Sequence, residues 1–120
     1  MAFYITTAID YVNGVPHLGH AYEKVAADVI ARHMRQRGED VFFLTGTDEH
    51  GEPVADAAHA EGIEPQQLAD RNAARFRALL PALNIANDFF IRTTDPEHEL
   101  RVQEVMQRIH DNGYTYMGLY

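Results

Sequence analysis

Two histidines stand where a strand pattern gives way to a helix pattern. His17 and His20 follow an apolar run, Phe3–Thr7, and a polar turn, and a long helical pattern begins at Ala21. In an α/β protein this junction gathers backbone N–H groups and a positive helix end, which together hold phosphate. Imidazole rings add donors there, and Gly19 lets a flat ligand approach the backbone. The motif fits a nucleotide site, but His-x-Gly-His alone is equally compatible with a surface turn or a pair of metal ligands.

Alternating strand and helix patterns run along the chain. They predict an α/β fold with a parallel sheet, flanking helices and right-handed crossovers. Ligands of such sheets bind beyond the carboxyl ends of the strands, so His17, His20 and Asp48 are expected in one crevice. The expected elements are strand 3–7, loop 8–19, helix 21–37, strand 41–45, loop 46–51, helix 53–61, a helix from 65, strand 88–92 and a helix from 96.

Apolar residues at helical spacing predict which helix faces are buried. Pro81 should kink or end the third helix, since proline lacks an N–H and disfavours helical geometry at the preceding residue. Thr94 or Asp95 is expected to cap the last helix. The expected core faces are Val25, Ala26, Val29, Ile30, His33 and Met34 in the first helix, Leu68, Asn72, Phe76, Leu79 and Leu83 in the third, and Val102, Val105, Met106 and Ile109 in the last.

Composition limits what the chain can be. Its 120 residues suffice for one domain at most, and a formal charge of −8 argues against a broad RNA-binding surface within it. It has no cysteine, so neither a disulfide framework nor a cysteine metal site is expected. No apolar stretch approaches the ~20 residues that span a bilayer, and no secretory leader is visible. A cytoplasmic protein without a membrane partner is the expectation.

Three segments of the chain resemble segments of class I aminoacyl-tRNA synthetases and occur in the same order as in that family. The first contains the histidine pair and resembles the first signature of that class. The second, from Phe42 to Gly51, is similar to the second strand and loop of the methionyl branch. The segments read Ala-Ile-Asp-Tyr-Val-Asn-Gly-Val-Pro-His-Leu-Gly-His-Ala-Tyr at 8–22, Phe-Phe-Leu-Thr-Gly-Thr-Asp-Glu-His-Gly at 42–51 and Phe-Phe-Ile-Arg-Thr-Thr at 89–94.

The resemblance implies a Rossmann-like nucleotidyl transferase fold and a ligase that activates methionine with ATP and Mg²⁺ and then charges tRNA(Met). It implies that His17 and His20 are the catalytic donors to the ATP phosphates. The implied ATP-binding residues are Asn13, Gly14, His17, Gly19 and His20, and the implied methionine-binding residues are Ile9, Tyr11 and Asp48. Asp48 would hold the substrate ammonium by a charge-assisted bond. No metal site is expected within these residues.

Other interpretations stay open. The residues alone favour Asp48 as a solvated loop carboxylate or a helix cap, and only the resemblance reverses that preference. Asn13 and Gly14 are explained equally well as turn chemistry. Carboxylates and imidazoles near the two loops resemble zinc ligands. The whole chain is alternatively a small nucleotidyltransferase with a His-x-Gly-His loop, or a non-catalytic module derived from a synthetase. Thr47 favours methionine, since class I relatives with branched aliphatic substrates usually have tryptophan before the aspartate.

The sequence also departs from the family pattern. The second signature, Lys-Met-Ser-Lys-Ser, does not occur in it. Residues 1–120 are therefore expected to be the N-terminal half of the catalytic domain, cut near the connective insertion. Ala8 and Asp10 replace residues common in relatives, and Asp10 adds a negative charge beside the ATP loop. We expect the isolated 120 residues to be inactive and to self-associate through an exposed sheet edge.

Overall fold

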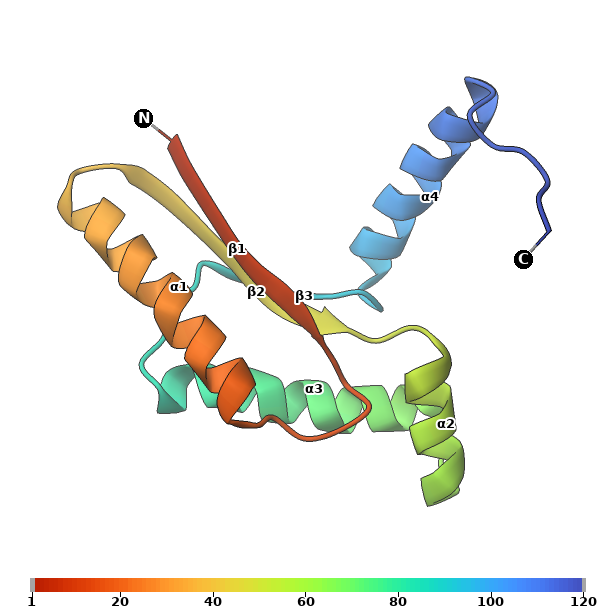
Figure 1. Cartoon of the computed structure of the whole chain (residues 1–120), viewed down its shortest axis with the longest axis horizontal. Helices are drawn as coiled ribbons and strands as arrows, with labels where there is room; N and C mark the ends of the chain where they lie inside the picture. The colour runs from red at the N-terminus through yellow and green to blue at the C-terminus, as the bar shows by residue number, and fades with distance from the viewer. Residues whose placement is uncertain (1, 120) are drawn as a thin grey trace.

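A three-stranded parallel sheet forms the centre of the fold in the computed structural model, which describes residues 2–119 (Figure 1). The strand order is β1-β2-β3, and helices connect successive strands. This confirms the predicted α/β fold with a parallel sheet and flanking helices. The elements are β1 (Ala2–Tyr11), α1 (Leu18–Gln36), β2 (Asp40–Asp48), α2 (Glu52–Glu61), α3 (Pro65–Ala82), β3 (Phe89–Arg92) and α4 (Pro96–Asp111).

The first strand is longer than its apolar run predicts. It continues to Tyr11 because β2 pairs with it beyond an irregularity between Thr6 and Ile9, where the register shifts. The expected loop 8–19 is therefore wrong, since the connection to α1 begins only after Tyr11 and ends at His17. A bulge of this kind re-aims the side chains that follow it, which here are those of the predicted site.

Helices α1 and α3 cover one face of the sheet, and α2 packs against α3 (Figure 1). Phe43 of β2 is fully buried against Ala27 and Ala31 of α1. A second cluster lies beneath the loop after β1, where buried Val12 meets the apolar faces of α2 and α3. Its buried members are Val12, Val54, Ala58, Leu68, Ala69, Ala73 and Phe76.

The predicted buried face of α1 is wrong. Val25, Val29 and Ile30 are exposed, and the helix packs on the sheet through Lys24, Ala27, Asp28 and Ala31. Alanines allow a close approach of helix to sheet. Both charged residues on that face have partners: Lys24 pairs with Asp10, and Asp28 with Arg32 and the Ala86 N–H. The periodicity detected an apolar stripe, but small and paired polar side chains make the contact instead.

The predicted core faces of the later helices are only partly confirmed. In α3, Leu68, Asn72 and Phe76 are buried as expected, whereas Leu83 is exposed and Leu80 is buried in its place. Helix α3 ends at Ala82, directly after Pro81, as the proline predicts. In α4 no residue is buried, so the expected core contacts of Val102, Val105, Met106 and Ile109 are not made by residues 2–119.

The opposite face of the sheet is apolar and bare over much of its area. Tyr4 and Phe42 stack there with ring centroids 6.0 Å apart, and Ile9, Tyr11 and Phe89 are exposed. Cα partners in a parallel ladder point to the same face, which places Tyr4 with Phe42 and Tyr11 with Asp48. Among residues 2–119, no helix is long and apolar enough to cross a bilayer.

Candidate active site at the carboxyl ends of the strands

His17 occupies the N-cap position of α1. Its ring Nδ1 accepts a hydrogen bond from the Gly19 N–H at 3.1 Å, and the His20 Nδ1 accepts one from the His17 N–H at 3.1 Å. This reciprocal pair is a capping box, which satisfies backbone donors left free at a helix start. The expected helix start at Ala21 is therefore too late. Sequence reasoning missed the cap because histidine is not among the usual N-cap residues.

The capping bonds determine the state of both rings. A neutral imidazole that accepts at Nδ1 carries its proton on Nε2, so each ring has an Nε2–H donor. The rings stack with centroids 3.7 Å apart, and the His20 ring makes a T-shaped contact with Phe76 of α3, with centroids 5.0 Å apart. Burial lowers the pKa of His20, an effect that Asp10 opposes and His17 reinforces. The two Nε2–H donors therefore stand at the positive end of α1.

Gly19 leaves room for the ring of His17. A Cβ at this position would lie 2.9 Å from Cε1 of His17, closer than real contacts allow. The local reason for glycine is thus space for the His17 ring. The role of Gly19 beside an adenine ring stays a prediction.

A buried ion pair lies beneath the histidines. Lys24 Nζ is 2.7 Å from Asp10 Oδ2, and both side chains are almost fully buried. The same ammonium contacts Glu23 at 3.0 Å and donates to the Ala8 carbonyl at 3.3 Å. Asp10 Oδ1 is also 3.8 Å from His20 Nε2. The predicted extra negative charge of Asp10 is therefore compensated by Lys24, one helical turn beyond His20.

A hollow of about 490 Å³ brings most of the predicted site residues together. It does not contain Asp48, which lines a neighbouring hollow of about 490 Å³ with His50, Thr93 and Glu99. Tyr11, which lines the first hollow, and Asp48, which lines the second, are partners in the β1–β2 ladder. Among the predicted residues, the first hollow is lined by Ile9, Tyr11, Asn13, Gly14, His17 and His20.

Val12 ties the two loops to each other. Its N–H donates to the Asp48 carbonyl at 3.4 Å, and its own carbonyl accepts from Asn72 Nδ2 of α3 at 2.7 Å. Its side chain is fully buried in the core beneath the loop. The histidine loop and the end of β2 are thus held together through one buried residue, which the sequence analysis did not single out.

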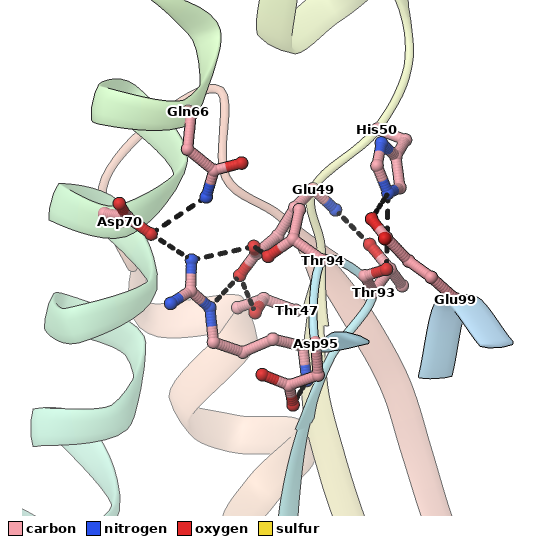
Figure 2. Close-up of polar contacts among 10 residues, drawn as sticks. Thr47, Glu49, His50, Gln66, Asp70, Thr93, Thr94, Asp95 and Glu99 are labelled. Atoms are coloured by element: carbon pink, nitrogen blue, oxygen red, sulfur yellow. Dashed lines mark hydrogen bonds and ion pairs between the residues drawn. The ribbon is translucent and has the colours of Figure 1, made fainter. Parts of the chain in front are cut away.

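Glu49 is the centre of a polar network beside Asp48 (Figure 2). Its fully buried side chain receives two hydrogen bonds from Arg92, at 2.8 and 2.9 Å, and one from Thr47 Oγ1 at 2.7 Å. Thr94 donates to the same carboxylate. Sequence reasoning considered Glu49 only among possible zinc ligands and did not pair it with Arg92, because 43 positions separate the two residues along the chain.

His50 lies on the outer side of this loop. Its Nε2 is 3.2 Å from the Thr93 carbonyl and 4.0 Å from Glu99 of α4, and the ring is exposed. Within residues 2–119, no three His, Cys, Asp or Glu side chains lie together in a way that could hold a metal ion.

The topology and the placement of the hollows define an α/β domain with a candidate ligand site at the carboxyl ends of parallel strands. A family model described as "tRNA synthetases class I (M)" matches residues 3–120. The chain belongs to this family, the methionyl branch of the class I tRNA synthetases.

Individual relatives agree with this assignment. The methionine–tRNA ligase of Rickettsia conorii is 54% identical over 118 residues, which are 98% of this chain and 23% of that protein. That of Thermotoga maritima is 52% identical over 120 residues, the whole of this chain and 19% of that protein. The solved methionyl-tRNA synthetase of Mycobacterium tuberculosis in complex with methionyl-adenylate has a TM-score of 0.91 and 51% identity. It is matched over 93% of this chain and 22% of its own. The chain thus spans about a fifth of the length of these relatives.

Proposed function

We propose that the protein carrying this chain is a methionine–tRNA ligase, which activates methionine with ATP and transfers it to tRNA(Met). Residues 1–120 would be the N-terminal part of its catalytic domain. The observation that carries the proposal is the pair of Nε2–H donors at the start of α1, held by the capping box and adjacent to the hollow of Asp48. The names of the relatives support the choice of amino acid. Charging of tRNA accompanies translation, so the proposed location is the cytoplasm.

In the proposed first step, a methionine carboxylate oxygen bonds to the α-phosphorus of ATP, and the bond from that phosphorus to the pyrophosphate oxygen breaks. Methionyl-adenylate and pyrophosphate result. The protein must bring two anions together and stabilise the charge that grows on the phosphoryl oxygens. His17 and His20 supply donors for those oxygens. ATP enters as its Mg²⁺ complex, so the ion is part of the substrate.

The remaining predicted residues surround these groups. Asn13, Gly14 and Gly19 would shape the approach of ATP to the histidine loop. Ile9 and Tyr11 would border the methionine side chain and amino group from β1.

The Asp48 carboxylate would receive the methionine ammonium. The hollow around Asp48 also contains the Glu99 carboxylate, which makes it favourable for a cation. A charged hydrogen bond of this kind is worth about 1.5–3 kcal/mol.

Methionine-dependent exchange of pyrophosphate into ATP tests the proposal, with the full-length protein that carries these residues. We expect exchange with methionine, and Asp48→Ala should raise the methionine requirement while leaving the ATP requirement nearly unchanged. Equal methionine affinity of variant and parent by calorimetry would refute the role of Asp48. Exchange without any amino acid would instead indicate a nucleotidyltransferase, and no exchange at all a binding module.

A further inference from the structure

The peptide unit between Asp48 and Glu49 is held from both sides. Its carbonyl, that of Asp48, accepts from the Val12 N–H at 3.4 Å, and its N–H, that of Glu49, donates to Thr93 Oγ1 at 2.9 Å. One bond reaches across to the loop after β1 and the other to the segment after β3. The backbone of Asp48 is therefore fixed between its two neighbouring segments.

The Glu49 side chain anchors this unit to the interior. Arg92 donates to both carboxylate oxygens, and Thr47 and Thr94 each donate to one of them. Burial alone would raise the pKa of Glu49, but the bonds from Arg92, Thr94 and Thr47 outweigh burial and lower it. Glu49 therefore stays ionised, and bidentate, charge-assisted bonds of this type are both strong and directional.

Arg92 extends the anchor to α3. Its Nη2 is 2.5 Å from Asp70 Oδ1, and Asp70 also accepts from Gln66 at 3.0 Å. Figure 2 shows Glu49 directed toward Asp70, whereas His50 points the other way, toward Glu99. The network thus joins β2, β3 and α3 on the side of the sheet away from the Asp48 hollow.

We propose that Glu49 is a positioning residue for substrate binding, which acts with Arg92 to hold the Asp48 carboxylate toward the substrate ammonium. This inference rests on the proposed function of Asp48. Alternation along the chain directs Asp48 and His50 to one side of the loop and Glu49 to the other, so Glu49 does not itself line the Asp48 hollow. It acts through the backbone that both residues share.

The test is Glu49→Gln in the full-length protein, measured by methionine-dependent pyrophosphate exchange. An amide has the same shape, but it lacks the charge and one of the two acceptor oxygens that Arg92 uses. Small displacements of a binding group cost up to about a hundredfold in function, so we expect the KM for methionine to rise roughly ten- to hundredfold. The KM for ATP should stay within about twofold of the parent, since the two histidines are held by their own capping box and the loop contacts the Asp48–Glu49 peptide only through the Val12 N–H.

Glu61→Gln is the matched control. Glu61 forms an equally direct pair with an arginine, Arg71 at 2.8 Å, but on the surface between α2 and α3. It should leave both KM values unchanged. Arg92→Lys should give an intermediate rise in the methionine KM, because lysine keeps the charge and loses the planar fork.

A second experiment, in a protein that already carries Asp48→Asn, shows whether Glu49 acts on methionine binding through Asp48 or independently of it. If Glu49 acts through Asp48, adding Glu49→Gln to Asp48→Asn should change the methionine KM by less than about twofold relative to Asp48→Asn alone. Equal factors in the two backgrounds would overturn the proposal, as would an unchanged methionine KM, or equal rises in both KM values, for Glu49→Gln alone. Absence of methionine-dependent exchange in the parent would refute the proposed function itself.

A milder variant serves if Glu49→Gln does not fold. Thr94→Val removes one donor to the carboxylate and leaves the Arg92 pair in place. We expect the methionine KM to rise about threefold with the ATP KM unchanged. An unchanged methionine KM in this folded variant would overturn the proposal.

Discussion

His17 combines two roles that substitution can separate. Its Nδ1 caps α1, and its Nε2–H is the proposed phosphate donor. His17→Ala removes both. His17→Asn keeps an acceptor at the δ position, and asparagine is among the strongest N-cap residues, but it has no group at the place of Nε2. The pair of variants therefore measures the cap and the donor independently.

The expected stability losses follow from the observed contacts. Loss of an N-cap acceptor costs about 0.5–2 kcal/mol. Loss of the ring that stacks on His20 at a centroid distance of 3.7 Å costs a further ~0.5–1.5 kcal/mol. His17→Ala should therefore lower the free energy of unfolding by about 1–3.5 kcal/mol, and His17→Asn should recover about 1 kcal/mol of that loss.

The expected rate losses are different. Removal of a donor to a developing oxyanion typically costs ~10²–10³ in rate. Both variants should therefore form methionyl-adenylate about equally slowly in single-turnover experiments. His59→Ala, at an exposed histidine in the last turn of α2, is the control and should match the parent in both measurements.

Denaturant unfolding and rapid-quench measurement of adenylate, both on the full-length protein, provide the two readouts. Recovery of the parental rate by His17→Asn would show that the cap alone matters and would refute the donor role. A His17→Ala variant as stable as the parent would refute the energetic importance of the capping box.

Four further predictions concern other parts of the fold. Lys24→Met should destabilise the protein by about 3–5 kcal/mol in denaturant unfolding, because it leaves the buried Asp10 unpaired, and Asp10→Asn added to it should restore much of the loss. A Cβ at Gly14 would meet nothing within 4 Å, so Gly14→Ala should keep the parental unfolding midpoint. A raised KM for ATP in this variant would indicate that Gly14 contacts the ligand, whereas an unchanged KM for ATP would indicate that Gly14 serves only the turn. The pKa of Glu49 in the folded protein lies below its ordinary 4.5, so the contribution of Glu49 to stability is full above pH 4.5 and is lost as the pH falls through the folded pKa. In acid titrations, Glu49→Gln should therefore weaken the dependence of the unfolding free energy on pH. The isolated 120 residues should self-associate in sedimentation, because β1 forms an edge of the sheet and one sheet face is bare and apolar; a stable monomer would contradict this.

The sequence by itself determined the order and kind of the elements. Apolar runs at Phe3–Thr7 and Val41–Thr45 predicted buried strands, and both lie within observed strands of the parallel sheet. Prolines and glycines gave helix limits: α3 begins at Pro65, and Gly62 caps α2 with φ of 69°. Such signals are local, because they depend on a residue's own backbone geometry. The family, too, could be predicted from three short segments.

Tertiary structure alone decided which side chains make the contacts. An apolar stripe on α1 does not reveal that Ala27 and Ala31 pack on the sheet instead, since that choice depends on how closely the helix approaches Phe43. The charge of Asp10 could not be assessed without Lys24, which helix geometry brings beneath the histidine loop.

The Glu49 network shows the same limit at the candidate site. Its acceptor follows β2 and its arginine ends β3, so their pairing requires the parallel register of two strands separated by two helices. Sequence types revealed which groups can bind phosphate or ammonium, since that is a property of the side chain. Whether a group is fixed in place, buried or ionised depends on its neighbours, and contacts between residues far apart in the sequence determine which neighbours it has.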